Sequence, residues 1–209
     1  MPGRMLKAIG EDEQKGVDNF MADQPRPAAV IPAGTWLIDP AHTMARFTVR
    51  HMTIAPVSGR FPGVSGTVLV PASDPLAAIV TATLDVVSVT TGVPRRDDMI
   101  RSAEFLDAAS YPAIAFQSKP ATPRADGDWD LPGDLTIKGV TRPARLDLAF
   151  GGLIRHRGAT RAGFTAAARI NRKDFGVSFN GLIDTGGAVV SDAVEITIAA
   201  EIVLQEPDD

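Results

Sequence analysis

The sequence predicts an all-β protein, an antiparallel barrel or sandwich with one short helix. From Thr35 onward the dominant hydrophobic period is two, which is the period of a strand with one apolar face. Clusters of Gly, Pro, Asp and Asn separate the alternating runs, as turns do. No internal repeat or second block of composition appears in the 209 residues. We therefore predict one domain over residues 35–205, preceded by a flexible N-terminal tail over residues 1–34.

Five alternating runs define the clearest strands. Each places apolar side chains on one face and polar side chains on the other, as an antiparallel sheet with one wet face requires. The first run points Phe47, Val49 and His51 to the same side. In chain order the runs are MARFTVRHM at 44–52, VTATLDVVS at 80–88, ARLDLAF at 144–150, AGFTAAARI at 162–170 and AVEITIAAEIVL at 193–204.

Turn signals lie between these runs. The segment LTIKGVTRPARLDL predicts a hairpin with Lys138 and Gly139 at its tip. The four predicted turn regions are APVSGRFPGVSG at 55–66, RADGDWDLPGD at 124–134, IKGVTRP at 137–143 and FNGLIDTGG at 179–187.

One segment, residues 92–112, has the signals of a short helix instead. Pro94 suits a first helical turn, because its missing N–H would have no partner there. Asp97 near the start and Arg101 near the end match the direction of the helix dipole.

Composition excludes several classes of function. A net charge of -4 and a pI near 5.4 leave no broad basic surface for nucleic acid. The absence of cysteine removes disulfides, thiolate catalysis and cysteine-ligated metals. Glu11, Asp12 and Glu13 stand where a secretory signal needs its apolar run, and no stretch reaches the roughly 18 apolar residues of a membrane span. We therefore expect a cytoplasmic protein with no integral membrane segment.

The three histidines do not form a metal motif. His42, His51 and His156 have neither H-x-H nor H-x-x-x-H spacing, and His42 and His51 differ in parity along one strand. We expect one structural histidine, one surface histidine and one at a pocket, and no metal site. GVSGT is not the nucleophile elbow G-x-S-x-G, and no phosphate-binding P-loop is present.

The sharpest enzyme-like motif is LIDTGG at 182–187. It resembles the catalytic triplet of aspartic proteases, in which two aspartates share a proton. Only 22 residues follow Gly187, too few for the flap and second strand of that site. We therefore interpret Asp184 as a loop carboxylate.

The blocks together resemble the YceI family, lipocalin-like barrels regarded as polyisoprenoid-binding proteins. GTWLIDPAHTMARFTVRHM is similar to the opening W-x-[IL]-D-x-x-H-[ST]-x-x-x-F-x-V-x-H of that family, through Trp36, Asp39, His42, Phe47 and His51. Five further blocks follow in order, so that the resemblance covers about Thr35 to Leu204: VSGRFPGVSG, RRDDMIRSAEFLDAASYPAIAFQS, GDLTIKGVTRP, AGFTAAARINRKDFGV and VSDAVEITI.

The resemblance implies a lipocalin-like β-barrel of about eight strands. It implies non-catalytic binding, carriage or sequestration of a polyprenyl quinone or polyprenyl phosphate, with no cofactor beyond a bound isoprenoid or fatty lipid. A homodimer is compatible with it. Met99 and Leu106 stand where the family often has His and Phe, which keeps the site apolar but alters head-group or chain-length recognition. Strand parity and the resemblance place eleven residues at the ligand: Phe47, Val49, His51, Phe61, Leu84, Met99, Phe105, Phe116, Phe164, Arg172 and Phe175.

The inward faces also predict a cavity without the resemblance. An eight-stranded barrel is wide enough for one small ligand, and small inward residues cannot fill it. The alternative is a hydrolase or isomerase in the same cavity, which needs titratable groups that converge there. Its candidates are His42, His51, Arg96, Asp97 and Arg172. On the binding interpretation, His51 holds the polar end of the ligand, and Arg172 supplies charge to an anionic head group. The small inward residues are Ala82, Ala144, Ala162, Ala166, Ala168 and Ala200.

Overall fold

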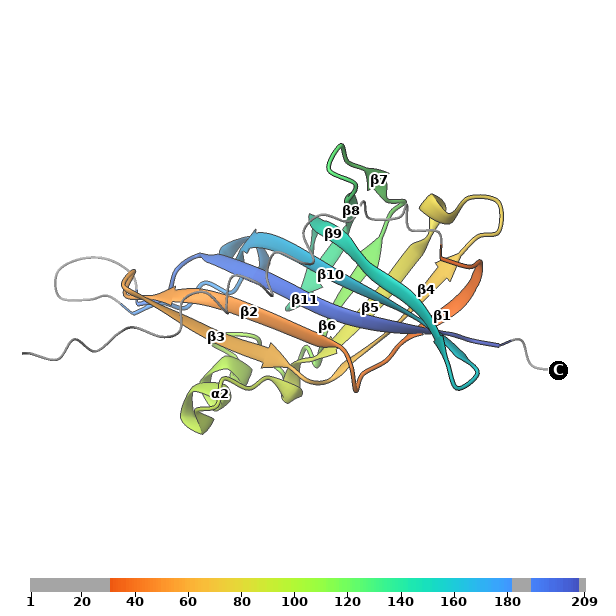
Figure 1. The fold of residues 1–209 in the computed structure, drawn as a ribbon. Helices are drawn as coiled ribbons and strands as arrows, with labels where there is room; N and C mark the ends of the chain where they lie inside the picture. Colours follow the sequence, from red (N-terminus) through yellow and green to blue (C-terminus); the bar gives the residue numbers. More distant parts are fainter. Residues whose placement is uncertain (1–30, 182–188, 207–209) are drawn as a thin grey trace, which may run out of the picture.

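The computed structural model describes residues 31–181 and 189–206, which form an antiparallel β-barrel with one short α-helix (Figure 1). In the described chain, three 3₁₀ turns, η1 (Pro75–Ala77), η2 (Val86–Ser88) and η3 (Arg172–Phe175), join some of the elements. The helix is α2 (Pro94–Arg101). The strands are β1 (Gly34–Ile38), β2 (Met44–His51), β3 (Ala55–Phe61), β4 (Val64–Val70), β5 (Ile79–Asp85), β6 (Ala113–Ser118), β7 (Thr122–Pro123), β8 (Trp129–Ile137), β9 (Val140–His156), β10 (Ala159–Asn171) and β11 (Ala193–Leu204).

Eight of the strands close a ring. The hydrogen-bonded order is β1, β4, β5, β6, β8, β9, β10 and β11, and β11 pairs back to β1. Trp36 shows the closure in one residue, because it stands opposite Val68 of β4 and Leu204 of β11. The predicted eight-stranded, lipocalin-like antiparallel barrel is confirmed.

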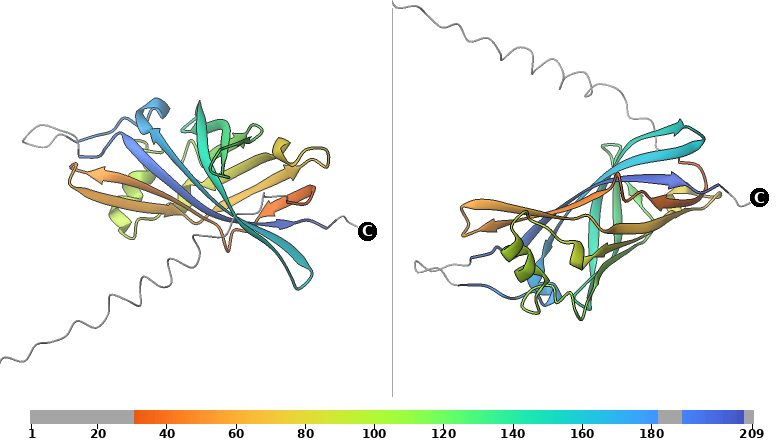
Figure 2. Two further views of the ribbon diagram at one scale, coloured as in Figure 1. Left: turned by 45° about the horizontal axis from the view of Figure 1, so that its top comes forward. Right: turned by 90° about the horizontal axis from the view of Figure 1, so that it is seen from below.

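Strand β11 has two neighbours along one edge. Its C-terminal residues Ile202–Leu204 pair with β1, whereas its residues Glu195–Ala199 pair with β2. Strand β3 pairs with β2, and an isolated bridge between Arg60 and Thr90 links β3 to the chain that leads into α2. The wall of this half of the barrel is therefore built from β2, β3 and the segment that contains α2 (Figure 2).

The helix begins and ends where its sequence signals predict. Pro94 stands in the first turn and Arg101 in the last. The Arg101 guanidinium donates to the carbonyl oxygens of Val87 and Val89, at 2.8 and 2.6 Å, and so ties the end of α2 to the η2 segment. The helix is thereby fixed against the barrel wall by polar contacts at its C-terminal end.

The tight hairpin predicted at Lys138 and Gly139 is also confirmed. These two residues connect β8 to β9, and both have positive φ, 50° and 74°. Two positive φ angles are what a two-residue turn needs to match the twist of its strands, which favours glycine at the second position.

Two predicted turn regions are too wide. Residues 55–66 contain all of β3 and the start of β4, and residues 124–134 contain the first part of β8. Pro56 and Pro132 produced the turn signal, because proline has no N–H to donate to a ladder. The structure tolerates Pro56 in β3, which pairs along β2, and Pro132 just before the β6 pairing starts at Gly133.

The core has two apolar clusters. The larger cluster includes Phe61, Phe105 and Phe116 and lies toward α2. The smaller cluster surrounds Trp36, whose side chain is 0% exposed and whose Nε1–H donates to the Pro32 carbonyl at 3.0 Å. Ile31 is 8% exposed and belongs to this cluster, although the sequence assigned it to the tail.

Two other sequence-based predictions concern the LIDTGG motif and membrane-spanning segments. The LIDTGG motif with Asp184 lies outside the described residues. Among the residues that the structure describes, no helix has the length and apolar character needed to cross a membrane.

Truncation at two points tests how much Ile31 and Pro32 contribute to the stability of the barrel. Removing residues 1–30 leaves both contacts of Trp36 in place, whereas removing residues 1–33 deletes them. We expect the longer truncation to reduce the free energy of unfolding by about 2 to 4 kcal/mol relative to the shorter one. Burial of an isoleucine contributes about 1.5 to 3 kcal/mol, and the lost hydrogen bond about 1 kcal/mol. Denaturant unfolding followed by circular dichroism measures the difference, and equal midpoints would contradict it.

Candidate ligand-binding cavity

The inward faces of the strands enclose a cavity of about 840 Å³. Apolar side chains from β2, β5, β8, β9, β10 and β11 line it, because alternate residues of each strand point into the barrel. Five of the six alanines predicted to leave space line the cavity, and Ala162 packs in the Trp36 cluster instead. The five are Ala82, Ala144, Ala166, Ala168 and Ala200.

All of the residues predicted to contact a ligand line this cavity. Their position on the wall agrees with the expected inward direction of these side chains, and ligand contact itself stays a prediction. The lining residues in question are Phe47, Val49, His51, Phe61, Leu84, Met99, Phe105, Phe116, Phe164, Arg172 and Phe175.

The aromatic part of the wall depends on one glycine. A Cβ atom at Gly59 would lie 2.4 Å from Cζ of Phe47, so any other residue there would force that ring to move. Phe47 therefore lies over β3 and contacts Phe61, with 5.7 Å between the ring centroids. The Phe47 ring therefore packs tightly against β3 in this wall of the cavity.

Sequence reasoning missed the contribution of β8. Leu131, Leu135 and Ile137 line the cavity from this strand, and Pro132 with Gly133 had indicated a turn there. The signal that could have found them is the alternation of Leu131, Gly133, Leu135 and Ile137, all of which are buried.

The described polar groups on the cavity wall are few, and none of them is a carboxylate. Within the described residues that line it, no Asp or Glu occurs. The described titratable or hydrogen-bonding side chains that line it are Thr43, Arg46, His51, Arg95, Arg96, Trp129 and Arg172. The described part of the wall therefore presents apolar surface and positive charge to the cavity.

Arg172 does not offer a free charge to a head group, contrary to the sequence-based expectation. The residue is 5% exposed, and burial lowers the pKa of its guanidinium while Asp192 opposes this effect. Its five N–H groups have five acceptors, which are the carbonyls of Val177, Phe179, Val190 and Ser191 and the carboxylate of Asp192. Arg172 therefore fastens the chain after η3 to the chain that precedes β11.

His51 lies at the end of β2, where the prediction placed it. It lines the cavity, and its backbone forms a bridge with Val190. Within residues 31–181 and 189–206, no hydrogen bond of its imidazole is found, so the ring nitrogens are available to a ligand. Of the polar side chains of the cavity, His51 is the one that offers both a donor and an acceptor in a single ring.

The candidate catalytic groups do not converge. Arg96, His51 and Arg172 line the cavity, whereas His42 and Asp97 do not. Burial acts to raise the pKa of Asp97, but hydrogen bonds from Thr91 and Thr90 outweigh it, and the net effect is a lowered pKa. Arg96 donates to the hydroxyl and carbonyl of Thr91. This cluster fixes the start of α2.

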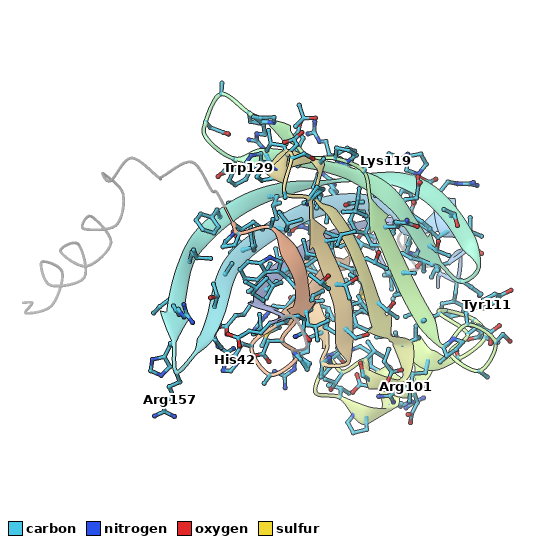
Figure 3. The ribbon with its side chains drawn as sticks, turned by 90° about the vertical axis from the view of Figure 1, so that its right-hand side faces the viewer. His42, Arg101, Tyr111, Lys119, Trp129 and Arg157 are labelled. Atoms are coloured by element: carbon cyan, nitrogen blue, oxygen red, sulfur yellow. The ribbon has the colours of Figure 1, made fainter. Side chains whose placement is uncertain are left out.

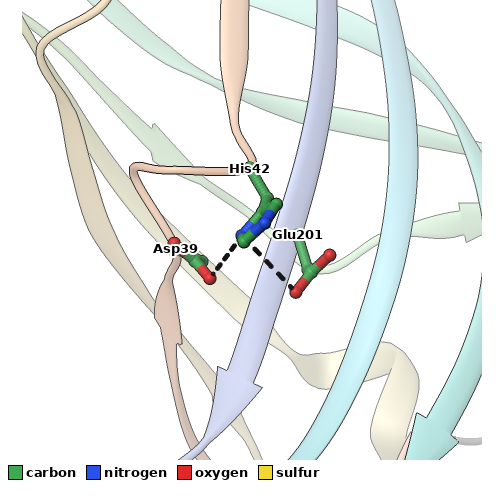
Figure 4. Close-up of side chains that lie close together, drawn as sticks. All are labelled: Asp39, His42 and Glu201. Atoms are coloured by element: carbon green, nitrogen blue, oxygen red, sulfur yellow. Dashed lines mark hydrogen bonds and ion pairs between the residues drawn. The ribbon is translucent and has the colours of Figure 1, made fainter.

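His42 belongs to an ion-pair cluster on the outside of the barrel (Figure 4). Its Nδ1 lies 2.9 Å from Oδ2 of Asp39 and 4.0 Å from Oε1 of Glu201. Arg161 donates from one nitrogen to both carboxylates, at 2.8 Å to Asp39. The cluster joins the β1–β2 connection to β10 and β11, beside the β1–β11 closure.

The same cluster has the ligand types of a metal site. Ligand atoms of Asp39, His42 and Glu201 lie within 4.8 Å of one another. The guanidinium of Arg161 contacts both carboxylates, however, and a cation placed among them would be repelled at short range. The residues therefore fit an ion-pair network better than a metal centre.

A closed antiparallel barrel around an apolar cavity defines a lipocalin-like β-barrel protein. The YceI-like domain model matches residues 36–202, and the chain belongs to this family. Protein YceI of Escherichia coli O17:K52:H18 is 35% identical over 166 residues, which is 79% of this chain and 83% of that protein. A UPF0312 protein of Shewanella baltica is 35% identical over 162 residues, 77% of this chain and 82% of its own.

Solved structures share the fold. BcnA of Burkholderia cenocepacia has a TM-score of 0.63 and 23% identity, over 78% of this chain and 98% of its own. A YceI protein of Campylobacter jejuni has a TM-score of 0.63 and 22% identity, over 96% and 100%. A domain from Saccharophagus degradans, described as polyisoprenoid binding and implicated in plant cell wall breakdown, has a TM-score of 0.59 and 15% identity, over 81% and 98%.

The ion-pair cluster predicts a pH-dependent stability. Hydrogen bonds from His42 and Arg161 lower the pKa of Asp39 from 3.8 to about 2, so its contribution is present above pH 3.8 and is lost as the pH falls toward 2. The hydrogen bond to Asp39 raises the pKa of His42 above 6.5, so its contribution is present below pH 6.5 and is lost as the pH rises through the raised value. The pair therefore stabilises most between these limits.

We expect His42→Ala to lower the melting temperature most near pH 5, and less at pH 2 or above pH 8. The effect is small and falls with added salt, because the His42 side chain is 61% exposed. His156→Ala is the matched control, since His156 is exposed and has no ion pair in the described part of the chain. A difference in melting temperature between His42→Ala and the parent that stays constant with pH would contradict the proposed role of the ion-pair cluster.

Proposed function

We propose that this protein binds a long isoprenoid-type lipid inside its barrel and carries or sequesters it without chemical change. The ligand class is a polyprenyl quinone or a polyprenyl phosphate. The observation that carries the proposal is the cavity of about 840 Å³ whose described lining is apolar and free of carboxylates. Membership of the YceI-like family and the likeness to a polyisoprenoid-binding domain support it.

The size and chemistry of the cavity suit a hydrocarbon chain. Pockets of about 300 to 1,000 Å³ hold small-molecule ligands, and this cavity is at the large end of that range. Each buried methylene contributes about 0.8 kcal/mol, so several prenyl units bind by burial alone. No specific polar contact is needed along the chain, and the wall supplies few.

The distribution of titratable groups favours binding over catalysis. A hydrolase or isomerase needs a general base and a general acid within hydrogen-bond reach of the reacting atoms. His51 and the arginines named above line the described part of the cavity. Asp97 and His42 do not line it, and they hydrogen-bond to Thr91 and Asp39 instead. The second candidate, an enzyme acting in the cavity, therefore has no carboxylate partner for His51 within the described residues.

The first test is what the purified protein carries. Native mass spectrometry and organic extraction of protein prepared without detergent should reveal a co-purified lipid. Delipidated protein should then bind a prenyl quinone or a polyprenyl phosphate at micromolar concentration or below. Absence of both carried lipid and binding would refute the proposal, and turnover of the bound lipid would support the enzyme instead.

Filling the cavity from β10 tests where the chain lies. Ala168→Phe puts a ring into the cavity, and we expect the affinity for a long prenyl chain to fall at least about tenfold, because the ring displaces several methylene contacts. Ala167→Phe is the matched control on the exposed outer face of the same strand. Both variants should keep the circular dichroism spectrum of the parent. Equal affinities for the two variants would place the ligand elsewhere.

His51→Ala tests recognition of the head group. Loss of one hydrogen bond should weaken a prenyl quinone by about 1 kcal/mol, which is the usual net value. A plain hydrocarbon of similar length should bind the variant and the parent equally. Isothermal titration with both ligands separates the effects, and equal losses would mean that His51 shapes the wall without contacting a head group.

A further inference from the structure

The cavity reaches the surface at the end of the barrel that carries α2. Val93, Arg95 and Met99 line the cavity and are also exposed, Val93 by 46% and Met99 by 41%. A residue that is both a wall residue and a surface residue marks an opening. These three residues therefore form one side of a mouth.

The turn between β2 and β3 lies beside the same mouth. His51 and Val189 line the cavity, and the N–H of Met52 donates to the Val189 carbonyl at 2.9 Å. Ile54 follows, and at 77% it is the most exposed large apolar side chain in the described chain. The turn and α2 lie toward one end of the barrel, away from the β9–β10 turn (Figures 1 and 2).

The rim of this mouth carries two exposed arginines. Arg50 and Arg95 are exposed and have no ion pair within the described residues. The carboxylate of Asp98 pairs with Arg101, and Asp97 is buried against threonines. Arginine beside isolated exposed apolar side chains is typical of surfaces that lie at a membrane interface.

A second group of exposed residues that line the cavity lies on η1, directly after a negatively charged residue. Pro75 and Leu76 line the cavity and are exposed, and the carboxylate of Asp74 precedes them. An anionic surface would be repelled by that carboxylate. The charge distribution thus favours the α2 mouth for an anionic partner.

We propose that the mouth rim, defined as Arg50, Met52, Ile54, Val93, Arg95 and Met99, docks on the surface of a bilayer that contains anionic phospholipid. Met52 and Ile54 enter the apolar boundary, and Arg50 and Arg95 contact phosphate groups. The cavity then opens directly onto the layer in which an isoprenoid lipid resides. Passage of the ligand rests on the proposed function, whereas docking does not.

The test uses delipidated full-length protein and two kinds of vesicle, phosphatidylcholine alone and phosphatidylcholine mixed with phosphatidylglycerol. We expect sedimentation with the mixed vesicles and much weaker sedimentation with the neutral ones. The double variant Arg50→Gln, Ile54→Ser should lose at least about fivefold in vesicle affinity, since one arginine near an anionic surface contributes about that factor. Both residues are exposed, so folding should be unaffected.

The opposite end of the barrel provides a matched control. The end of β9 carries an exposed isoleucine and arginine of its own, Ile154 and Arg155, and Arg157 in the β9–β10 turn points away from the barrel (Figure 3). The double variant Ile154→Ser, Arg155→Gln should sediment like the parent. A loss in this control with none in the mouth variant would overturn the proposal and assign docking to the β9–β10 turn.

Two further readouts separate the alternatives. Light scattering after size exclusion shows whether Arg50→Gln, Ile54→Ser converts a dimer into a monomer, in which case the rim is an interface between copies and the proposal fails. Binding of the apolar fluorophore N-phenyl-1-naphthylamine reports on the cavity without vesicles. It should be equal in the parent and both variants, because none of the four substituted residues lines the cavity. If the parent protein binds the fluorophore but not the mixed vesicles, membrane docking is overturned and the proposed function stands. If the parent protein binds the mixed vesicles but not the fluorophore, docking stands and the proposed function is overturned.

Discussion

The division of β11 between two partners is the constraint on which the rest of the structure depends. Its last residues pair with β1 and close an eight-stranded ring, while its first residues pair with β2. Because β1 has five residues and β11 has twelve, β1 alone cannot close the barrel along its length. The β2–β3 hairpin and α2 complete the wall where β1 ends, and the mouth of the cavity lies among these added elements.

The interior of the barrel stays open because its inward side chains are apolar and partly small. Alanines on β5, β9, β10 and β11 leave volume that the larger residues around them do not fill. An empty apolar volume forfeits dispersion contacts, so a ligand that fills it stabilises the protein as well as being held by it. Among the described residues that line the cavity, none is a carboxylate, and most of the lining is apolar.

The arginines of this protein differ in the groups to which they donate. Arg172 and Arg101 each donate to several backbone carbonyls as well as to one carboxylate, which fixes irregular chain near the cavity. Arg161 instead holds two carboxylates beside the closure of the ring. Arg50 and Arg95 have no such partner in the described chain, and this is why the proposed membrane contact is assigned to them.

The sequence by itself determined which side chains face inward. Direction alternates along a strand by local geometry, so Phe47, Phe164 and the other wall residues that lie on strands could be placed without knowing the neighbouring strands. The hairpin tip at Lys138 and the start of α2 at Pro94 were predictable for the same reason, since backbone angles are a local property. The strand status of Pro132 was not local, because it depends on where pairing with β6 begins. Only the tertiary structure decided the partners of Arg172 and the meeting of Asp39 with Arg161 and Glu201, because a long polar side chain bonds to whatever distant chain the fold brings within its reach.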